Sequence, residues 1–362
     1  MRPHPTYNRF NALKILAYSD RLRQVAKGEE PYPIDWHIYP SNVCNHKCTW
    51  CMFRQPAAGD GKVEQFDFRV KLSGDLLMRA VEDAARTGAR LVHFSGGGEP
   101  LLNSHTMVAM SLARERGLKV AMSTNGRLLR PEHAALVDYM RVSLNAGTAK
   151  QHWKTNHGSD EKDPGDWQTI MDRIRDSLPA RAGDFGLGFV VDHENFSDIY
   201  PFCGVAAALG VDFVHIRPAF YYEGDKDRAT RAAMPYALKE CERAKADFGD
   251  RVAIFSITDR FDGYWSPRTY DRCRAVWTGI CLRATGDFAV CQDRTDLTFG
   301  LDPSYAKGAT FEEVWHSDEH RRVVEAIHAG GQLDRCPRCV WNKRNEIIDA
   351  CFVRDDMRME MV

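Results

Sequence analysis

The chain has 362 residues, a formal net charge of −1 and 11 cysteines. This length suits one large domain or two ordinary ones, and the nearly balanced charge gives no reason to expect nucleic acid or an anionic membrane as a partner. The sequence has no apolar run of transmembrane length, and its first residues lack the apolar core of a signal peptide. We therefore expect a cytoplasmic protein, in which clustered cysteines indicate metal ligands or reactive thiols rather than disulfides.

A polar lead-in, residues 1–35, precedes the first expected strand. Residues 11–26 carry apolar side chains at helical spacing, which predicts a surface helix. Pro31 and Pro33 end this helix and introduce a strand over Trp36–Tyr39.

Three cysteines lie in the short segment after that strand: Cys44, Cys48 and Cys51. Thiolate is a soft ligand that suits zinc, copper(I) or an iron–sulfur cluster. Tetrahedral zinc would want a fourth ligand, for which His46 is the near candidate. A cluster of four irons held by three cysteines would instead leave one iron open for an outside ligand.

This Cys-x3-Cys-x2-Cys segment, with Trp50 before its last cysteine, resembles the signature of the radical S-adenosylmethionine (SAM) superfamily. The resemblance implies that the three cysteines hold a 4Fe–4S cluster whose open iron is chelated by SAM. It further implies that reductive cleavage of SAM gives a 5′-deoxyadenosyl radical, which abstracts a hydrogen atom from the substrate. A carrier such as flavodoxin or ferredoxin would supply the electron. The alternative interpretation is a zinc knuckle or three core thiols.

Helices and strands then alternate up to about residue 217. The expected helices are 73–86, 104–116, 131–139, 167–178 and 196–209, and they precede strands at 90–94, 119–123, 141–144, 186–191 and 211–217. Such alternation predicts an α/β fold with a parallel sheet. With the first strand it gives six βα units, short of an eight-stranded barrel, and resembles the partial (β/α)6 TIM-like barrel of radical SAM cores.

The chain becomes irregular after the sixth strand. We expect a polar linker over residues 220–231, a helix over 232–248 and a domain boundary near residue 250, because no βα alternation follows. The predicted division is a lead-in (1–35), a core barrel (36–250) and a small cysteine-rich domain (251–362).

A glycine-rich stretch, Gly96-Gly97-Gly98-Glu99, follows the second strand. Glycines let a backbone approach a ligand closely, and a helix N-terminus suits a carboxylate or phosphate; an ordinary βα turn is the alternative. The spacing matches neither a Rossmann nor a P-loop fingerprint. It resembles the radical SAM GGE motif, which implies that this backbone and the Glu99 carboxylate hold the amino group of SAM.

Polar residues also follow the later strands, where parallel α/β folds place their ligand groups. By resemblance, four of them are candidates for contacts to SAM: Ser123, Asn125, Ser143 and Asn145. Helix capping and turn formation are the alternative roles for these residue types. The candidates for binding a polar substrate are His193, Glu194, Arg217, and Tyr221 or Tyr222.

A second set of cysteines occupies the C-terminal part. A Cys-x2-Cys pair joined to distant cysteines is a metal signal, and zinc or an iron–sulfur cluster would fit. Cys273, Gly286-x4-Cys291 and Cys336-x2-Cys339 resemble the SPASM/twitch extensions of radical SAM enzymes. The resemblance implies a second, auxiliary 4Fe–4S cluster with four cysteine ligands: Cys273, Cys291, Cys336 and Cys339.

Other cysteines leave alternatives open. Cys281 competes with Cys273 as the first auxiliary ligand, and we favour Cys273 from the spacer length. The shorter twitch version fits better than the full SPASM version because only Cys351 follows the Cys-x2-Cys pair. Cys203 and Cys241 lie in apolar helical contexts and are expected to be buried thiols.

The function that we expect is a radical SAM enzyme acting on a small polar metabolite, such as a sugar, aminosugar or nucleoside, in natural-product biosynthesis. Hydrogen abstraction would lead to dehydrogenation, epimerisation, or elimination or decarboxylation. The candidate donors for a returning hydrogen atom are Cys281, Cys203 and Cys351. One alternative is a maturase of ribosomal peptides, which the short lead-in disfavours because it has no room for a leader-binding domain. The other is a non-catalytic metal-binding scaffold.

Overall fold

The computed structural model describes residues 10–54, 66–157, 164–219, 221, 224–256, 268–329, 333, 336, 339 and 341–354. Its strands form one sheet in the order β10-β9-β8-β1-β2-β3-β4-β5-β6-β7. The strands are β1 (Asp35–Ile38), β2 (Leu91–Phe94), β3 (Lys119–Thr124), β4 (Tyr139–Ser143), β5 (Asp184–Val191), β6 (Phe213–Pro218), β7 (Ala253–Ser256), β8 (Gly279–Leu282), β9 (Phe288–Ala289) and β10 (Thr298–Phe299). Tyr222, a candidate for substrate binding, lies outside the described residues.

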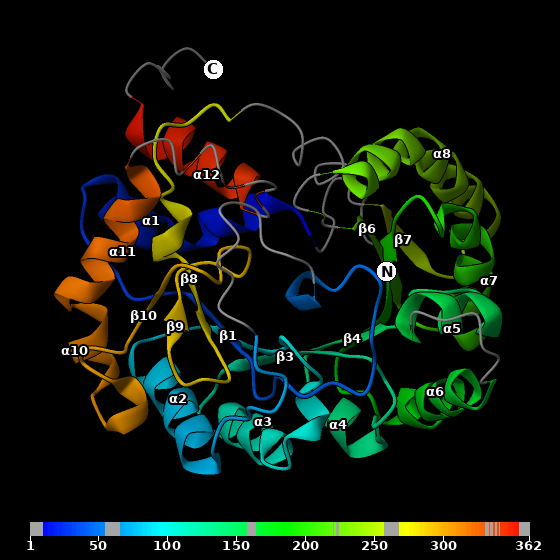
Figure 1. The fold of residues 1–362 in the computed structure, drawn as a ribbon, viewed down its shortest axis with the longest axis horizontal. Coiled ribbons are helices and arrows are strands. Elements are labelled where there is room, and N and C mark those ends of the chain that lie inside the picture. The colour runs from blue at the N-terminus through cyan, green and yellow to red at the C-terminus, as the bar shows by residue number, and fades with distance from the viewer. Residues whose placement is uncertain are drawn as a thin grey trace.

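Helices surround this curved sheet (Figure 1). They are α1 (Ser19–Ala26), α2 (Gly74–Arg86), α3 (Thr106–Glu115), α4 (Pro131–Ala135), α5 (Ala149–His157), α6 (Pro164–Ser177), α7 (Ile199–Leu209), α8 (Asp225–Phe248), α10 (Phe311–Trp315), α11 (Asp318–His328) and α12 (Asn342–Ile348). Within the described residues, no helix combines the length and apolar character needed to cross a membrane.

All six strands predicted up to residue 217 are present, and β1 to β7 pair in parallel. The α/β prediction is therefore confirmed, and the sheet is an open, partial barrel with β7 and β10 as its end strands. Helix α2 begins after Ser73 as predicted, since the Ser73 hydroxyl accepts a 3.2 Å hydrogen bond from the Leu76 N–H.

Several helical segments differ from the prediction: Ala12–Tyr18 form a 3-10 helix, and α4 ends at Ala135 rather than at residue 139. Helix α8 begins at Asp225, inside the expected linker, because Asp225 and Asp227 place carboxylates in its first turn, where the helix dipole favours them. Helix α5, over Ala149–His157, was not predicted. Its sequence is mostly polar and gives no apolar stripe, although three polar side chains on it are buried: His152, Thr155 and Asn156.

The two faces of the sheet differ in character because strand side chains alternate. Trp36 and Ile38 of β1 are fully buried in the core under the helices, together with Val92 and Phe94 of β2. The intervening residues face the inside of the partial barrel. They include His37, His93, Ser123, Arg141, Ser143, His215 and Arg217, as the strand registers show.

The C-terminal cysteine-rich part joins the same sheet. Strand β8 pairs in parallel with β1, with Asp35 opposite Gly279 and Ile38 opposite Leu282. Strands β8 and β9 form an antiparallel hairpin around residues 285–287, and β10 extends it in antiparallel fashion. Strand β7 lies just past the expected boundary at residue 250 and pairs with β6. The predicted division at residue 250 thus falls within one continuous sheet.

Candidate active site and metal centres

The segment that carries Cys44, Cys48 and Cys51 packs directly on the glycine-rich turn. The Gly98 N–H donates to the Ser41 carbonyl at 3.0 Å, and the Glu99 N–H donates to the Val43 carbonyl at 2.8 Å. A Cβ atom on Gly98 would lie 2.3 Å from the Val43 oxygen, so this position admits only glycine. The glycines therefore bring the turn and the cysteine segment together, whatever else they bind.

Helices α5 and α6 hold the other side of the segment. The Lys47 and Thr49 N–H groups donate to the carbonyls of Asn156 and Thr155, at 2.6 and 2.9 Å. These contacts fix the backbone between the cysteines. No sequence pattern indicates these contacts, because α5 lies far along the chain and a backbone carbonyl can belong to any residue type.

A buried carboxylate, Asp166 at the start of α6, anchors the same segment. Its oxygens lie 3.2 Å from His46 Nε2, 2.8 Å from His152 Nε2 and 2.8 Å from Arg127 Nη1. The ligand atoms of His46, His152 and Asp166 lie within 4.8 Å of one another, a spacing that a metal ion would accept. The Arg127 guanidinium already supplies positive charge there, so the cluster acts as an ionic anchor.

The three thiols of the segment share one electrostatic environment. Burial raises the pKa of Cys44 to about 11, and Glu99 and Cys51 add to the rise. Burial also raises the pKa of Cys48, and its neighbours Cys51 and Cys44 raise it further. A metal group bound here must therefore displace protons from the thiols. Three adjacent sulfur donors fit a cluster that keeps one open iron.

Glu99 is buried and already well hydrogen-bonded. Its carboxylate accepts from the Leu101 N–H at 3.1 Å, the Thr124 hydroxyl at 2.7 Å and the Asn125 N–H at 2.7 Å. Burial raises the pKa of Glu99, and these hydrogen bonds oppose the rise. Since a carboxylate has about four acceptor sites, three are occupied and one remains for the amino group of SAM. Asn125 also donates to Asn45 at 2.6 Å, which ties the end of β3 to the cysteine segment.

The other candidates for SAM contacts lie on β3 and β4. Ser123 is joined to His93 by a 2.9 Å hydrogen bond on the inner face of the sheet, and Ser143 lies opposite Gly188 on the same face. Asn145 has a positive φ of 58° and accepts from the Val190 N–H at 2.9 Å. Asn145 therefore has the turn-forming role that its residue type allows.

The inner face of the sheet is polar and positively charged. The aliphatic part of Arg141 passes over Gly188 of β5, and a Cβ atom added to Gly188 would lie 3.2 Å from Arg141 Cδ. Arg141 Nη1 lies 3.1 Å from His215 Nδ1. Burial holds the pKa of His93 well below its usual value, and His37, Arg141 and Arg217 lower it further. The barrel interior thus suits a polar or anionic group.

The structure does not group the predicted substrate residues. Arg217 faces the inside of the barrel, opposite Val190 of β5. His193 instead lies 3.3 Å from the Thr230 hydroxyl of α8, and Glu194 is exposed in the turn after β5. Tyr221 is buried and donates to Asp192 at 2.8 Å. Arg141 and His215, which the sequence analysis did not single out, lie closer to the barrel interior than His193 or Glu194.

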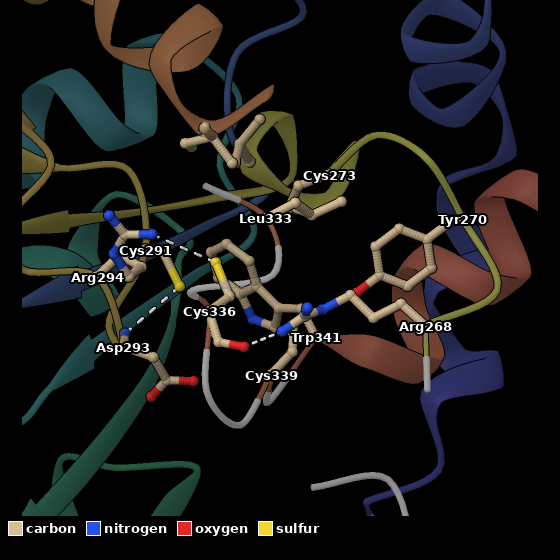
Figure 2. A pocket seen from close by; sticks show the side chains of 12 residues that line it. Arg268, Tyr270, Cys273, Cys291, Asp293, Arg294, Leu333, Cys336, Cys339 and Trp341 are labelled. Carbon is tan, nitrogen blue, oxygen red and sulfur yellow. Dashed lines mark hydrogen bonds between the residues drawn. The ribbon is translucent and has the colours of Figure 1, made fainter. Parts of the chain in front are cut away.

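Four cysteines of the C-terminal part line one pocket (Figure 2): Cys273, Cys291, Cys336 and Cys339. Cys273 precedes the short helical turn Ala275–Trp277, Cys291 follows β9, and the other two precede α12. Burial raises the pKa of Cys273 to about 11. Four sulfur donors around one enclosed space fit a closed metal centre.

The remaining thiols lie elsewhere. Cys281 is 1% exposed beside the Tyr39 phenol and does not line the pocket; burial raises its pKa to about 12. Cys203 on α7 is fully buried near Cys241 on α8, in the core and away from the inner face, as expected for small apolar side chains. Cys351 is exposed after α12. Of the three candidate hydrogen donors, only Cys281 lies on the inner face of a strand, opposite His37.

The parallel strand order and the three-cysteine segment agree with the expected radical SAM core. Residues 38–199 match the family model described as the radical SAM superfamily, so this part of the chain is similar to a radical SAM domain. The curated relatives carry enzyme names. GTP 3′,8-cyclase of Aeromonas hydrophila subsp. hydrophila is 35% identical over 109 residues, which are 29% of this chain and 30% of that protein. PqqA peptide cyclase of Rhodopseudomonas palustris is 27% identical over 267 residues, which are 69% and 66% of the two chains.

Solved structures share the fold over most of the chain. SuiB of Streptococcus suis bound to S-adenosylmethionine has a TM-score of 0.60 at 15% identity, and the match covers 91% of this chain and 74% of that chain. Native anSMEcpe with bound AdoMet has a TM-score of 0.58 at 15% identity, with 89% and 92% covered. The chain spans only 30%, 29% and 56% of the length of the first curated relatives that it matches.

Proposed function

We propose that the protein uses Cys44, Cys48 and Cys51 to hold a 4Fe–4S cluster and cleaves SAM reductively to a 5′-deoxyadenosyl radical. The observation that carries this proposal is the match of residues 38–199 to the radical SAM superfamily. The three half-buried, mutually interacting thiols beside the glycine-rich turn support it. An external carrier such as flavodoxin or ferredoxin would supply the electron.

The residues around the cysteine segment have distinct proposed roles. The turn Gly96–Glu99 and the ends of β3 and β4, with Ser123, Asn125, Ser143 and Asn145, would border the bound SAM. Their contacts to the cysteine segment support this assignment, because a ligand of the open iron must lie beside them. Asp166 would keep the segment in place while the cofactor supplies the difficult chemistry.

We propose a small polar metabolite as the substrate, bound inside the partial barrel. The inner face supports this proposal, because His93, Arg141, His215 and Arg217 offer hydrogen-bond donors and positive charge there. A sugar, aminosugar or nucleoside with a charged group would match these side chains. Dehydrogenation, epimerisation, and elimination or decarboxylation are the outcomes that follow from loss of a hydrogen atom at carbon.

Peptide modification is the second candidate function. It is favoured by the similarity to PqqA peptide cyclase over 267 residues. SuiB, which shares the fold with a TM-score of 0.60, has also been solved bound to the precursor peptide SuiA. A peptide would have to extend out of the barrel past the C-terminal part, whereas a small metabolite would lie wholly within it.

We also propose that Cys273, Cys291, Cys336 and Cys339 hold a second 4Fe–4S cluster. Their convergence on one pocket supports this ligand set over one that includes Cys281. Four cysteines would close its coordination, so the cluster would serve electron transfer or structure rather than bind substrate.

One experiment tests the activity and separates the substrate classes. Anaerobic protein is incubated with SAM, a reductant and deuterium-labelled sugars, nucleosides or ribosomal peptides, and 5′-deoxyadenosine is analysed by mass spectrometry. Deuterium transfer from a sugar or nucleoside would support the first candidate, and transfer only from a peptide would replace it with the second. A Cys48→Ala variant is the control that should form no 5′-deoxyadenosine. A non-catalytic scaffold would form none in either protein.

A further inference from the structure

Cysteine sulfurs of the C-terminal pocket accept hydrogen bonds from N–H groups of residues that are not themselves proposed ligands (Figure 2). Arg294 Nη1 donates to Cys336 Sγ at 3.5 Å, and Asn345 Nδ2 donates to Cys273 Sγ at 3.5 Å. We infer that these two side chains raise the reduction potential of the cluster held in the pocket. The inference rests on the proposed second cluster and names the residues of this chain that tune it.

Arg294 is held in position by an acidic partner. Its Nε and Nη2 donate to the two carboxylate oxygens of Asp296, at 2.9 and 2.8 Å, in a two-point contact. The planar guanidinium therefore has a fixed orientation that directs Nη1 to Cys336. The Arg294 side chain is only 11% exposed, whereas that of Asp296 is 61% exposed. Water screens the carboxylate much more than the guanidinium, so Asp296 cancels only part of the positive charge that Arg294 places beside Cys336. The Asp293 carboxylate, which also lines the pocket, acts on Cys291 and Cys339 in the opposite sense.

The orientation of the Asn345 side chain is fixed by a second hydrogen bond. Its Oδ1 accepts from the Ala275 N–H at 2.8 Å, so the amide group must turn Nδ2 toward Cys273. The side chain is 1% exposed, which leaves little freedom to rotate. The Asp293 N–H adds a backbone donor to Cys291 Sγ at 3.4 Å. Three of the four sulfurs thus receive an N–H group.

Hydrogen bonds to cluster sulfurs raise the reduction potential because they stabilise the more negative, reduced state. The effect is strong where water is excluded, since the effective dielectric constant of the interior is low. A cationic donor acts more strongly than a neutral amide. Arg294 should therefore contribute more than Asn345.

A raised potential favours the oxidative outcome among those proposed for the substrate. The substrate radical would lose one electron to the second cluster and one proton to solvent, after its hydrogen atom has passed to 5′-deoxyadenosine. An external one-electron acceptor of higher potential than the cluster, such as an oxidised flavoprotein or iron–sulfur protein, would then reoxidise the cluster. The protein contributes the buried donors that make the cluster a ready electron acceptor.

The test uses the full chain with Cys44, Cys48 and Cys51 replaced by alanine, so that only the second cluster contributes to the signal. Iron content is measured, and the midpoint potential is read from a redox titration followed by electron paramagnetic resonance. Arg294→Gln should lower the midpoint, Arg294→Lys should lie between it and the parent, and Asn345→Leu should give a smaller drop. Arg175→Gln, which breaks an exposed pair with Asp172 on α6, is the matched control and should leave the midpoint unchanged.

The possible failures are distinguishable. A parent protein without iron would refute the proposed second cluster itself. Variants that keep their iron and the parent midpoint would overturn the tuning role while leaving the second cluster in place. If Arg294→Gln loses its iron, Asn345→Leu and Arg294→Lys decide the question. Loss of iron in all three would show that the donors serve assembly, which also overturns the tuning role.

Discussion

The two groups of cysteines are built in opposite ways. Cys44, Cys48 and Cys51 occupy one short segment, whose position is set by backbone hydrogen bonds to the glycine-rich turn and to α5. The second group draws on separate segments between Cys273 and Cys339 and encloses a pocket. Among the described contacts, the first group has a backbone donor at Cys44, at 3.4 Å, whereas the second also has the side-chain donors Arg294 and Asn345.

This difference follows from what each site is proposed to hold. A cluster that binds SAM needs an open iron, so its cysteines can come from one loop that leaves a side uncovered. A cluster with four cysteine ligands has no open iron, and the protein can enclose it and direct donors at its sulfurs. The two sites should therefore respond differently to the same kind of change.

Substitution of the first group of cysteines is expected to have the largest effect on activity and iron content. Replacing Cys44, Cys48 and Cys51 by alanine should abolish formation of 5′-deoxyadenosine and remove roughly four irons per chain, because the SAM-binding cluster has no other ligands. Iron analysis and chromatography of the reaction measure both quantities. The second cluster should remain, and continued cleavage of SAM would refute the ligand assignment.

Substitutions in and beside the second group distinguish a cluster ligand from a cysteine that only lies nearby. Cys273→Ala should cost the second cluster, again roughly four irons, whereas Cys281→Ala should retain it because Cys281 lies outside the pocket beside Tyr39. Iron content and the optical absorbance of the cluster distinguish the two variants. Loss of the cluster in Cys281→Ala, with the cluster kept in Cys273→Ala, would show that Cys281 is the ligand in place of Cys273.

Acidic pH should lower the free energy of unfolding through a buried histidine on α11. His320 on α11 is 1% exposed, its ring nitrogen lies 2.6 Å from the Trp315 carbonyl, and burial lowers its pKa to about 4. The unfolded chain, with a histidine pKa of about 6.5, binds more protons than the folded chain between these values. The free energy of unfolding should therefore fall by up to about 3 kcal/mol as the pH drops from about 6.5 to about 4.

Urea unfolding followed by tryptophan fluorescence measures this pH dependence, because Trp277 and Trp315 contact the His320 ring. His320→Phe should flatten the fall, and His316→Phe, at an exposed histidine of the same region, should not. An equal slope in wild type and His320→Phe would assign the acid sensitivity to other groups.

The smallest effect concerns the anchor of the first group. Asp166→Asn weakens the contacts to His46, His152 and Arg127 and should cost about 1–3 kcal/mol of unfolding free energy, because buried partners lose a charged acceptor. Asp172→Asn on the same helix is exposed and should stay within about 0.5 kcal/mol. Chemical unfolding gives both values. Asp166→Asn should also alter the resonance spectrum of the first cluster and leave that of the second unchanged; the reverse pattern would contradict the anchoring role.

The sequence was most informative where a structural feature is local. The strands up to β6 follow from apolar runs between turn residues, and the first cysteine group follows from one motif. The second group was predicted from its resemblance to SPASM/twitch extensions, and the structure brings the same four cysteines to one pocket.

The residues that support both sites were missed for a physical reason. Asn345 lies 72 positions from Cys273, Arg294 lies 42 positions from Cys336, and Asp166 contacts His46 from helix α6. Nothing in the residue types of an asparagine, an arginine or an aspartate separates a buried donor or anchor from a solvated side chain. Helix α5 was missed for a related reason, since its buried side chains are polar and give no apolar period.

The parallel pairing of β1 with β8 has a consequence for how the chain is made. As the nascent chain leaves the ribosome, β1 can pair with β2 early, but its other edge stays open until Leu282 has been synthesised. An unpaired edge beside the apolar Trp36 and Ile38 is a template for wrong association. Strand β1, which leads into the first cysteine group, becomes an interior strand only when β8 has been synthesised and has paired with it. Folding of the first cysteine region is therefore completed only after the start of the C-terminal part has been made.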